Sequence, residues 1–360
     1  MMIPTEPIGS IPRPPELVAA IRGGAGASQL APLLDAAVRT TVAAFEASGS
    51  PVISDGEQGK LDNFWCYPVR GAANTAPDGF RIPVSPRGKG RPQRMPRLTR
   101  GPFRYQRYAD EYVRAAQRYA CQPVKQAIIS PSALSLLYPP DGLPGYPREQ
   151  FLDDLVREHE TEIRRCLEAG AHKVQVDFAE GPLAMRLDPS GALLASFVHL
   201  NNMALARFSS AERALIGVHV SAAGVWLDGA DAAEAGHVDY AELLPALFEI
   251  RAGSFYIAMA GQPEPERVLR NARDYARPDQ RVFVGVTDPL DPRIESAEQV
   301  RDRVLLAARY LDPQRLGTTD DAGFAPFFDD DGVGRPTAFA KLRARVEGTR
   351  LAAALLVGAA

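Results

Sequence analysis

Short apolar segments rich in β-branched residues alternate along the chain with longer amphipathic segments. The apolar segments predict eight strands, over residues 7–11, 51–57, 123–130, 173–178, 214–221, 254–260, 281–288 and 315–320. Helical periodicity is clear in the intervening segments 149–170, 240–250 and 296–311. Strands that alternate with helices form a parallel sheet covered by helices. Eight such units favour an α/β fold of the (β/α)8 TIM-barrel type over a doubly wound sheet.

One long segment interrupts this alternation. Residues 59–120 contain a Pro/Gly-rich stretch and are too long for an ordinary loop between a strand and a helix. Structured insertions of this length are often functional lids. No linker or repeat divides the chain, so we expect residues 1–360 to form a single barrel, with 59–120 as an inserted lid after the second strand. The basic stretch from Arg87 to Arg107 is interpreted as solvated, or as a grip for an anionic small molecule.

Composition and charge narrow the functional class. The 360 residues are 46% hydrophobic and 24% charged, which is typical of a soluble globular protein. A net charge of -3 and a pI near 6.0 argue against a nucleic-acid partner. The three cysteines form no C-x-x-C pair, which favours a reducing cytoplasm. The N-terminus lacks the pattern of a signal peptide, and the apolar segment 351–360 is about half as long as a membrane span. We therefore expect a cytoplasmic protein with a small-molecule substrate and no membrane or nucleic-acid partner; a homodimer stays open.

Polar residues gather at the ends of the expected strands. In a TIM barrel the chemistry lies at the carboxyl ends of the strands. The residues at those positions are Asp55, Glu57, Asp177, Glu180, His219, Ser221, Thr287, Asp288, Asp320 and Asp321. One imidazole facing several carboxylates suits a hard cation, a substrate amine or proton transfer. Each acid by itself could instead cap the helix that follows. His237, in the loop after the same strand as His219, lies on the correct side of the barrel to approach it.

Other motifs exclude some functions. The sequence has no G-x-G-x-x-G after a strand, no P-loop and no G-x-S-x-G elbow. Nicotinamide, ATP and serine-hydrolase chemistry therefore lack support. Around the third expected strand, Lys125, Gln126, Ser130 and Ser132 are candidate polar contacts to a substrate.

Several motifs resemble one known family. They are IGSIPRP, SDGEQGK, the segment ending in QVD, GVHVS, LGTTDDAGF followed by PF, and AFAKLRARVEGTRLA. In this order they are similar to cobalamin-independent methionine synthase, and more closely to its short single-barrel bacterial relatives, often called type II. The resemblance covers nearly the whole chain and implies a TIM barrel. In that family a zinc ion activates a thiol, which then attacks the methyl group of a methylfolate.

The resemblance also implies site residues. The zinc-binding histidine is kept as His219, whereas Ser221 and Ala322 occupy the positions of the two cysteines. Ile257 or Ala258 stands where the acidic ligand belongs. Soft thiolates hold zinc, serine is a poor neutral ligand and alanine is none, so we do not expect a thiol-methylating zinc site. By the same resemblance, the backbone of residues 8–10, Glu57 and Asp177 match positions that hold the amino-acid substrate.

Three functions are compatible with these residues. The preferred hypothesis is a mononuclear non-haem Fe(II) enzyme that performs oxidative or lyase chemistry on a small polar or heterocyclic substrate in specialised metabolism. Its metal ligands are His219, His237 and Asp321, its catalytic residues Asp177, Glu180 and Asp321, and its substrate-binding residues Ser10, Glu57, Asp177, Ser221 and Asp288. The alternative is a methylfolate-dependent methyltransferase with a non-thiol acceptor and one of the catalytic acids as general base. The third is a non-catalytic binding protein.

Overall fold

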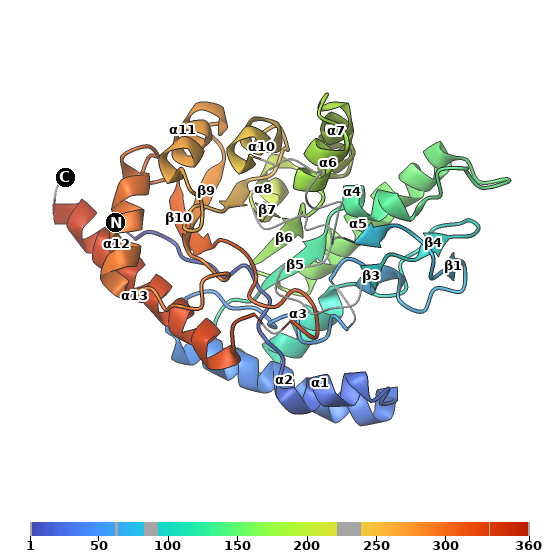
Figure 1. Ribbon diagram of the computed structural model, residues 1–360, viewed down its shortest axis with the longest axis horizontal. Helices are drawn as coiled ribbons and strands as arrows, with labels where there is room; N and C mark the ends of the chain where they lie inside the picture. Colours follow the sequence, from blue (N-terminus) through green and yellow to red (C-terminus); the bar gives the residue numbers. More distant parts are fainter. Residues whose placement is uncertain (1, 62–63, 83–92, 222–238, 331, 359–360) are drawn as a thin grey trace.

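The computed structural model describes residues 2–61, 64–82, 93–221, 239–330 and 332–358. Its centre is a six-stranded parallel sheet in the order β10–β9–β8–β7–β6–β5 (Figure 1). The strands are β5 (Lys125–Ile129), β6 (Lys173–Asp177), β7 (Ile216–Val220), β8 (Ser254–Ile257), β9 (Arg281–Thr287) and β10 (Leu316–Asp320). All six coincide with expected strands, and their bounds differ from the expectation by three residues at most.

The first two expected strands are reduced to single bridges. Thr5 pairs with Thr318 of β10, and Ile53 pairs with Val124 just before β5. These two N-terminal segments also meet each other, since the amide of Ile11 donates to the carbonyl of Gly56 at 3.0 Å. The ring of neighbours therefore closes, which agrees with the expected TIM-barrel-like fold. The expectation of a full strand over 7–11 is wrong, because prolines at positions 4, 7, 12 and 14 supply no N–H for a ladder.

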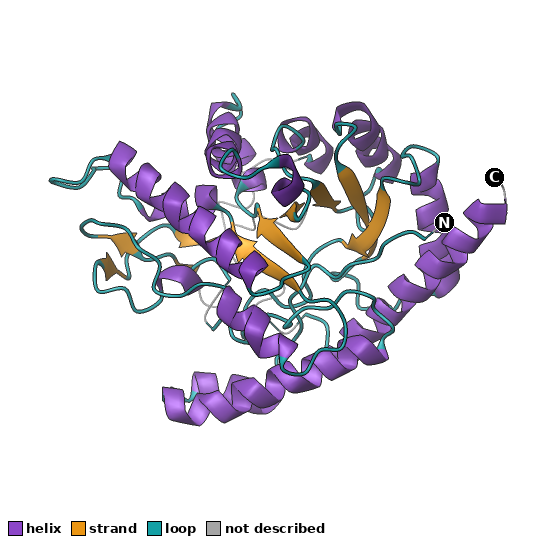
Figure 2. Ribbon diagram, turned by 180° about the vertical axis from the view of Figure 1, so that it is seen from behind, coloured by secondary structure: helices purple, strands orange, loops and turns teal. Residues whose placement is uncertain are grey.

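Helices cover the outside of the sheet (Figures 1 and 2). Those of seven or more residues are α1 (Pro15–Arg22), α2 (Ala27–Ala47), α3 (Asp110–Gln117), α5 (Arg148–Glu168), α6 (Gly181–Leu187), α7 (Ala192–Leu205), α10 (Tyr240–Leu247), α11 (Pro265–Tyr275), α12 (Ala297–Ala308) and α13 (Arg335–Gly358). Two short helices, α4 (Pro131–Leu134) and α8 (Ser210–Arg213), lie in connections. None of the described helices combines the length and apolar character needed to cross a membrane.

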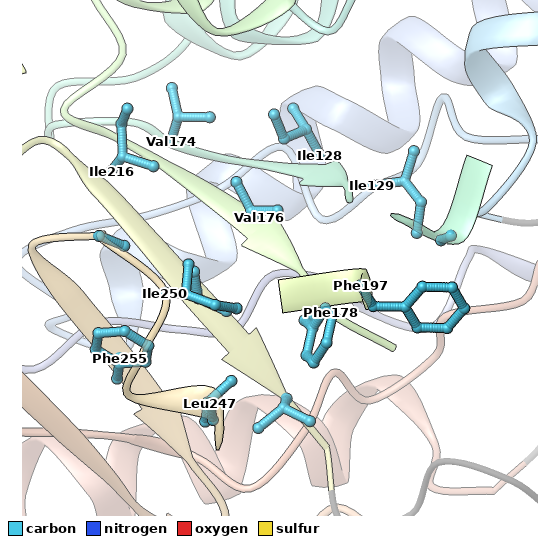
Figure 3. Packing of buried hydrophobic residues seen from close by; sticks show 14 of the residues in the cluster. Ile128, Ile129, Val174, Val176, Phe178, Phe197, Ile216, Leu247, Ile250 and Phe255 are labelled. Carbon is cyan, nitrogen blue, oxygen red and sulfur yellow. The ribbon is translucent and has the colours of Figure 1, made fainter. Parts of the chain in front are cut away.

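Side chains alternate between the two faces of each strand. In β6, Val174 and Val176 join the apolar layer between the sheet and the helices (Figure 3). Lys173, Gln175 and Asp177 point to the opposite face, inside the barrel, where they contact Glu6 of the N-terminal segment, Lys125 of β5 and His219 of β7, respectively. The interior thus has polar positions running from the start of β6 to its end.

The interior also holds two large aromatic rings. Tyr256 and Phe283 stack with their ring centroids 4.7 Å apart. Glycines on neighbouring strands provide the space, because a Cβ at Gly217 would lie 2.6 Å from the ring of Tyr256 and one at Gly317 would lie 2.4 Å from that of Phe283. The barrel is consequently filled by side chains rather than open along its axis.

The insertion after the second expected strand contains short antiparallel pairs. The described part includes η1 (Tyr67–Val69), the pair β1 (Thr75–Ala76) with β4 (Arg97–Leu98), the pair β2 (Arg81–Ile82) with β3 (Gln93–Arg94), and α3. It is attached to α5 through buried Glu162, which accepts from the Tyr67 hydroxyl at 2.6 Å and from the Ala109 amide at 3.2 Å. A lid function for 59–120 remains a prediction.

Candidate active site at the carboxyl ends of the strands

A buried charged cluster follows the second expected strand. Lys60 is completely buried, and its Nζ lies 3.2 Å from Oε2 of Glu57 and donates to the carbonyl of Ala127 at 2.9 Å. Glu57 adopts a left-handed backbone conformation with φ of 56°, which turns the chain back toward the barrel. The Arg13 guanidinium fixes this turn by donating to the carbonyls of Glu57 and Lys60 at 2.6 and 2.8 Å. The segment therefore presents a carboxyl and an ammonium together.

The electrostatics of this cluster favour proton exchange near neutrality. Burial raises the pKa of Glu57 to about 7. The nearby carboxylates of Asp177 and Asp55 act in the same direction, whereas the Lys60 ammonium lowers this pKa. A carboxyl group with such a pKa can hold or release a proton at physiological pH.

His219 and Asp177 form a pair on adjacent strands. Asp177 ends β6, His219 lies in β7, and the sheet register places the two residues side by side. Nδ1 of His219 is 3.0 Å from Oδ1 of Asp177, and the same oxygen accepts from Nε2 of Gln175 at 2.8 Å. Within the described part of the chain, the buried Nε2 of His219 has no hydrogen-bond partner. An imidazole oriented in this way can accept a proton at Nε2.

Glu180 lies just beyond the end of β6 and contacts a different set of polar side chains from those around Glu57 and His219. It is completely buried, and its Oε1 accepts from the hydroxyl of Ser130 at 2.6 Å and from that of Ser132. Asn201 of α7 donates to the Ser132 hydroxyl at 2.6 Å. Burial raises the pKa of Glu180 to about 7 even though both serine bonds lower it. Among the described residues, its second oxygen has no partner.

Three other candidate residues make local contacts. The Ser10 hydroxyl accepts from the amide of Ala325 at 3.3 Å, which joins the first segment to the loop after β10. Asp288 accepts from the amide of Leu290 at 2.8 Å and so shapes the turn after β9. Ser221 directly follows β7 and is half-buried. A contact of these three residues with a substrate remains a prediction.

The carboxylate of Asp321 accepts hydrogen bonds from backbone amides. Its two oxygens accept from the amides of Met259, Ala260 and Gly261 at 2.7–2.9 Å, so that it fixes the loop after β8. Burial raises its pKa to about 7. His237 lies outside the described residues. In the described ranges, no group of three or more His, Cys, Asp and Glu side chains is arranged to hold a metal ion.

The residues present do not fit the zinc ion that the family resemblance implies. Ile257 is buried in the apolar layer, and the amide of Ala258 donates to the Tyr240 hydroxyl at 2.9 Å. Ala322 supplies no donor. His219 is thus the one ligand retained from that set, without the thiolates that make such a site tight at neutral pH. We derive no chemical step through zinc.

Sequence reasoning overlooked several polar residues that the barrel brings into this region. Arg13 and Lys60 stand inside the quoted motifs IGSIPRP and SDGEQGK. Lys60 contacts Glu57 three positions away, whereas Arg13 reaches this turn across 44 or more positions. Gln175 was not singled out. The alternation in KVQVD, with polar residues at every second position of a buried strand, is the signal that could have found it.

Comparison with known proteins identifies relatives of full length. The chain is 24% identical to "Methionine synthase" of Sulfurisphaera tokodaii over 97% of this chain and 92% of the relative. No family model matches. Similar folds occur in a B12-independent methionine synthase from Shewanella sp. W3-18-1 (TM-score 0.73, 18% identity, 99% of this chain and 100% of that chain) and in a putative one from Listeria monocytogenes (TM-score 0.66, 17% identity, 97% and 98%). A methyltransferase from Methanosarcina mazei is more distant (TM-score 0.53, 12% identity, 97% and 94%).

These findings correct the preferred functional hypothesis. The similar proteins are named methionine synthases, which points to methyl transfer and overturns Fe(II)-dependent oxidative or lyase chemistry. The expectations of iron, of oxidoreductase activity and of a role in specialised metabolism have no support in these similar proteins. The sequence relative and the fold together confirm, over the whole chain, the resemblance to the cobalamin-independent methionine synthase family.

Proposed function

We propose that this protein is a methyltransferase that moves a methyl group from a methylated nitrogen, as in a methylfolate, to an acceptor that is not a thiol. The single observation that carries the proposal is that the site lacks the cysteines of the resembling family but contains buried acids. The thiolate positions are Ser221 and Ala322, whereas Glu57 and Asp177, which match family positions by resemblance, are buried, and Asp177 contacts His219. Glu180 is a further buried acid just beyond Asp177. An acceptor without a thiol needs a base rather than a soft metal.

The reaction requires two proton transfers, one from the acceptor to the protein and one from the protein to the donor nitrogen, and exchange with water then restores the starting protonation of both groups. With an amine acceptor, a new bond forms between the acceptor nitrogen and the methyl carbon while the bond from that carbon to the donor nitrogen breaks. The acceptor loses one proton and the donor nitrogen gains one, so atoms and charge balance. Nε2 of His219, supported through Nδ1 by Asp177, takes the proton from the acceptor. Glu180 in its protonated form supplies the proton for the leaving nitrogen.

Glu57 and Asp177 orient the acceptor in this proposal. Their carboxyl groups are close enough for the charge of Asp177 to raise the pKa of Glu57. An ammonium group of an amino acid placed between them relieves that repulsion. The similar Shewanella protein was crystallised in complex with selenomethionine, which supports an amino-acid-like molecule as the acceptor class.

The test follows the methyl group directly. Purified protein is incubated with methyltetrahydrofolate carrying a ¹³C-methyl group and with a panel of amino acids and amines, and the label is followed by NMR. We expect label in an N-methyl product and none when a thiol such as homocysteine is the acceptor. Label that appears only in the thioether would contradict the non-thiol acceptor.

The metal requirement provides a second test. Elemental analysis after dialysis against excess zinc should find well below one equivalent, and a chelator should leave the transfer rate unchanged. Ser221→Cys with Ala322→Cys is the matched variant, because two thiolates at the positions that the family resemblance assigns to zinc ligands should raise zinc affinity at least about tenfold. Stoichiometric zinc in the unaltered protein would refute our interpretation of the ligand positions.

A further inference from the structure

A chain of buried polar groups connects the amino end of the barrel with the active-site pair. Lys125 and Lys173 are the first residues of β5 and β6, whereas His219 lies near the end of β7. Lys173 Nζ donates to Oε1 of Glu6 at 2.8 Å, and the Tyr256 hydroxyl donates to Oε2 of Glu6 at 2.5 Å. Lys125 Nζ lies 3.7 Å from Glu6 Oε2 and 3.9 Å above the Tyr256 ring. A buried cluster of charged and polar side chains therefore lies at the amino end of the barrel; it consists of Glu6, Lys125, Lys173 and Tyr256.

Lys125 links this cluster to the Asp177–His219 pair. Its Nζ donates to Oε1 of Gln175 at 2.8 Å, and Nε2 of Gln175 donates to Oδ1 of Asp177 at 2.8 Å. That oxygen faces Nδ1 of His219 at 3.0 Å. Lys125 and Gln175 are 1% and 0% exposed, so water does not compete for these bonds.

The donor and acceptor properties of these groups fix every orientation in the chain. An ionised carboxylate only accepts, so the NH2 of Gln175 must face Asp177 and its carbonyl oxygen must face Lys125. Burial lowers the pKa of Lys125 to about 7, and its Nζ keeps an N–H to donate in either protonation state. An ionised carboxylate only accepts, so Nδ1 of His219 must carry the hydrogen. Nε2 then has a free lone pair. The carboxylate of Asp177 consequently determines which nitrogen of His219 is basic, and Gln175 holds that carboxylate in place between Lys125 and His219.

We propose that Gln175 is a positioning residue that links Nζ of Lys125 to the Asp177–His219 pair and holds His219 in the tautomer protonated at Nδ1. The value of this tautomer for methyl transfer rests on the proposed function, but the tautomer itself does not. Glu57 and Lys60 act on Asp177 from the segment after the second expected strand, and neither replaces the Gln175 bond.

The tautomer can be measured without any assay. In protein labelled with ¹⁵N-histidine, two-dimensional NMR distinguishes protonated from unprotonated ring nitrogens, and a His219→Gln variant assigns the signal. We expect unaltered protein at pH 8 to show His219 protonated at Nδ1 and unprotonated at Nε2. A signal for the tautomer protonated at Nε2 would overturn the proposal, and this measurement is made on the unaltered protein, with His219→Gln needed only for assignment.

Variants of two buried glutamines distinguish a positioning role of Gln175 from a general effect on core packing. Gln175→Leu removes the bond that holds Oδ1 of Asp177, so the carboxylate is free to turn away from Nδ1. Much of the His219 population should then convert to the Nε2-protonated tautomer that free imidazole prefers. Gln126→Leu is the control, because Gln126 is equally buried and its Nε2 donates to the carbonyl of Ala127. An unchanged His219 signal in a folded Gln175→Leu protein, or the same change in Gln126→Leu, would refute the coupling. Should Gln175→Leu fail to fold, Gln175→Met carries the same comparison.

The readouts also distinguish the two proposals. If the tautomer is as expected but no methyl acceptor is found, the proposed function fails and the positioning role stands. If methyl transfer is found in Gln175→Leu at the normal rate, with an unchanged His219 signal, the positioning role fails and the function stands.

Discussion

Nδ1 of His219 lies 3.0 Å from Oδ1 of Asp177, across two adjacent parallel strands, whereas Nε2 has no hydrogen-bond partner among the described residues. The sheet register pairs the two residues, so their separation does not depend on a loop. Rigid placement of a base and its orienting carboxylate is a requirement of general acid–base catalysis.

Replacing Asp177 by Asn should therefore lower kcat for methyl transfer by about 10²- to 10⁴-fold. The amide can donate as well as accept, so it no longer selects the tautomer with a free Nε2. Asp153→Asn, at an exposed position of α5, is the matched control and should keep the normal rate. A variant of Asp177 with a kcat within twofold of normal would remove this residue from the mechanism.

The rate of methyl transfer should fall above pH 7. Burial raises the pKa of Glu180 to about 7, and only its protonated form gives a proton to the leaving nitrogen. On the alkaline side we expect about a tenfold loss of kcat per pH unit. The variant Glu180→Gln should be slow at every pH and lack this alkaline limb. An alkaline limb that persists in Glu180→Gln would assign the titration to another group.

Gly9 should control the position of Glu57. It has φ of 154°, and a Cβ there would lie 3.1 Å from Oε1 of Glu57. Gly9→Ala should displace that carboxyl by a few tenths of an ångström and weaken binding of an amino-acid acceptor about tenfold, as measured by calorimetry. Gly24→Ala introduces a side chain at another positive φ, 69°, with no atom within 4 Å, and should leave binding unchanged. Equal binding by both variants would show that Glu57 does not hold the acceptor.

The stability of the protein should decrease from about pH 4.5 to about pH 8 through Glu162. Burial raises the pKa of this carboxyl to about 8 in the folded protein, above its usual 4.5. Between these values the unfolded chain loses the proton and the folded protein keeps it, so unfolding becomes more favourable by about 1.4 kcal/mol per pH unit.

Urea unfolding of Glu162→Gln at several pH values tests this effect. The neutral amide does not titrate, so the free energy of unfolding of the variant should gain on that of the unaltered protein as the pH rises through this window. Glu149→Gln, at an exposed position in the first turn of α5, should show no such gain. Parallel pH curves for Glu162→Gln and the unaltered protein would contradict the raised pKa.

Much of the fold was predictable because burial requires apolar residues at regular spacing. The six strands β5–β10 and the long helix α5 coincide with segments that periodicity identified. The lengths of the two N-terminal strands were overestimated, because prolines interrupt ladder bonding and only single bridges form at Thr5 and Ile53.

The candidate site was predictable in part. Asp177, Glu180, His219 and Glu57 lie at strand ends, and the parallel sheet brings such positions together. Asp321 occupies an equivalent position, yet its carboxylate binds three backbone amides. Nothing in the residue type distinguishes these outcomes, because the partners come from distant segments.

The sequence by itself determined the alternation of strands and helices, the set of residues at the carboxyl ends and the absence of cysteines at the thiolate positions. These are local properties, set by the period of side-chain direction and by chemical identity. Only the tertiary structure decided which polar atoms meet: Lys125 with Gln175, Gln175 with Asp177, and Asp177 with His219. Burial of those atoms removes competing water, so the partner that folding supplies determines protonation, tautomer and charge.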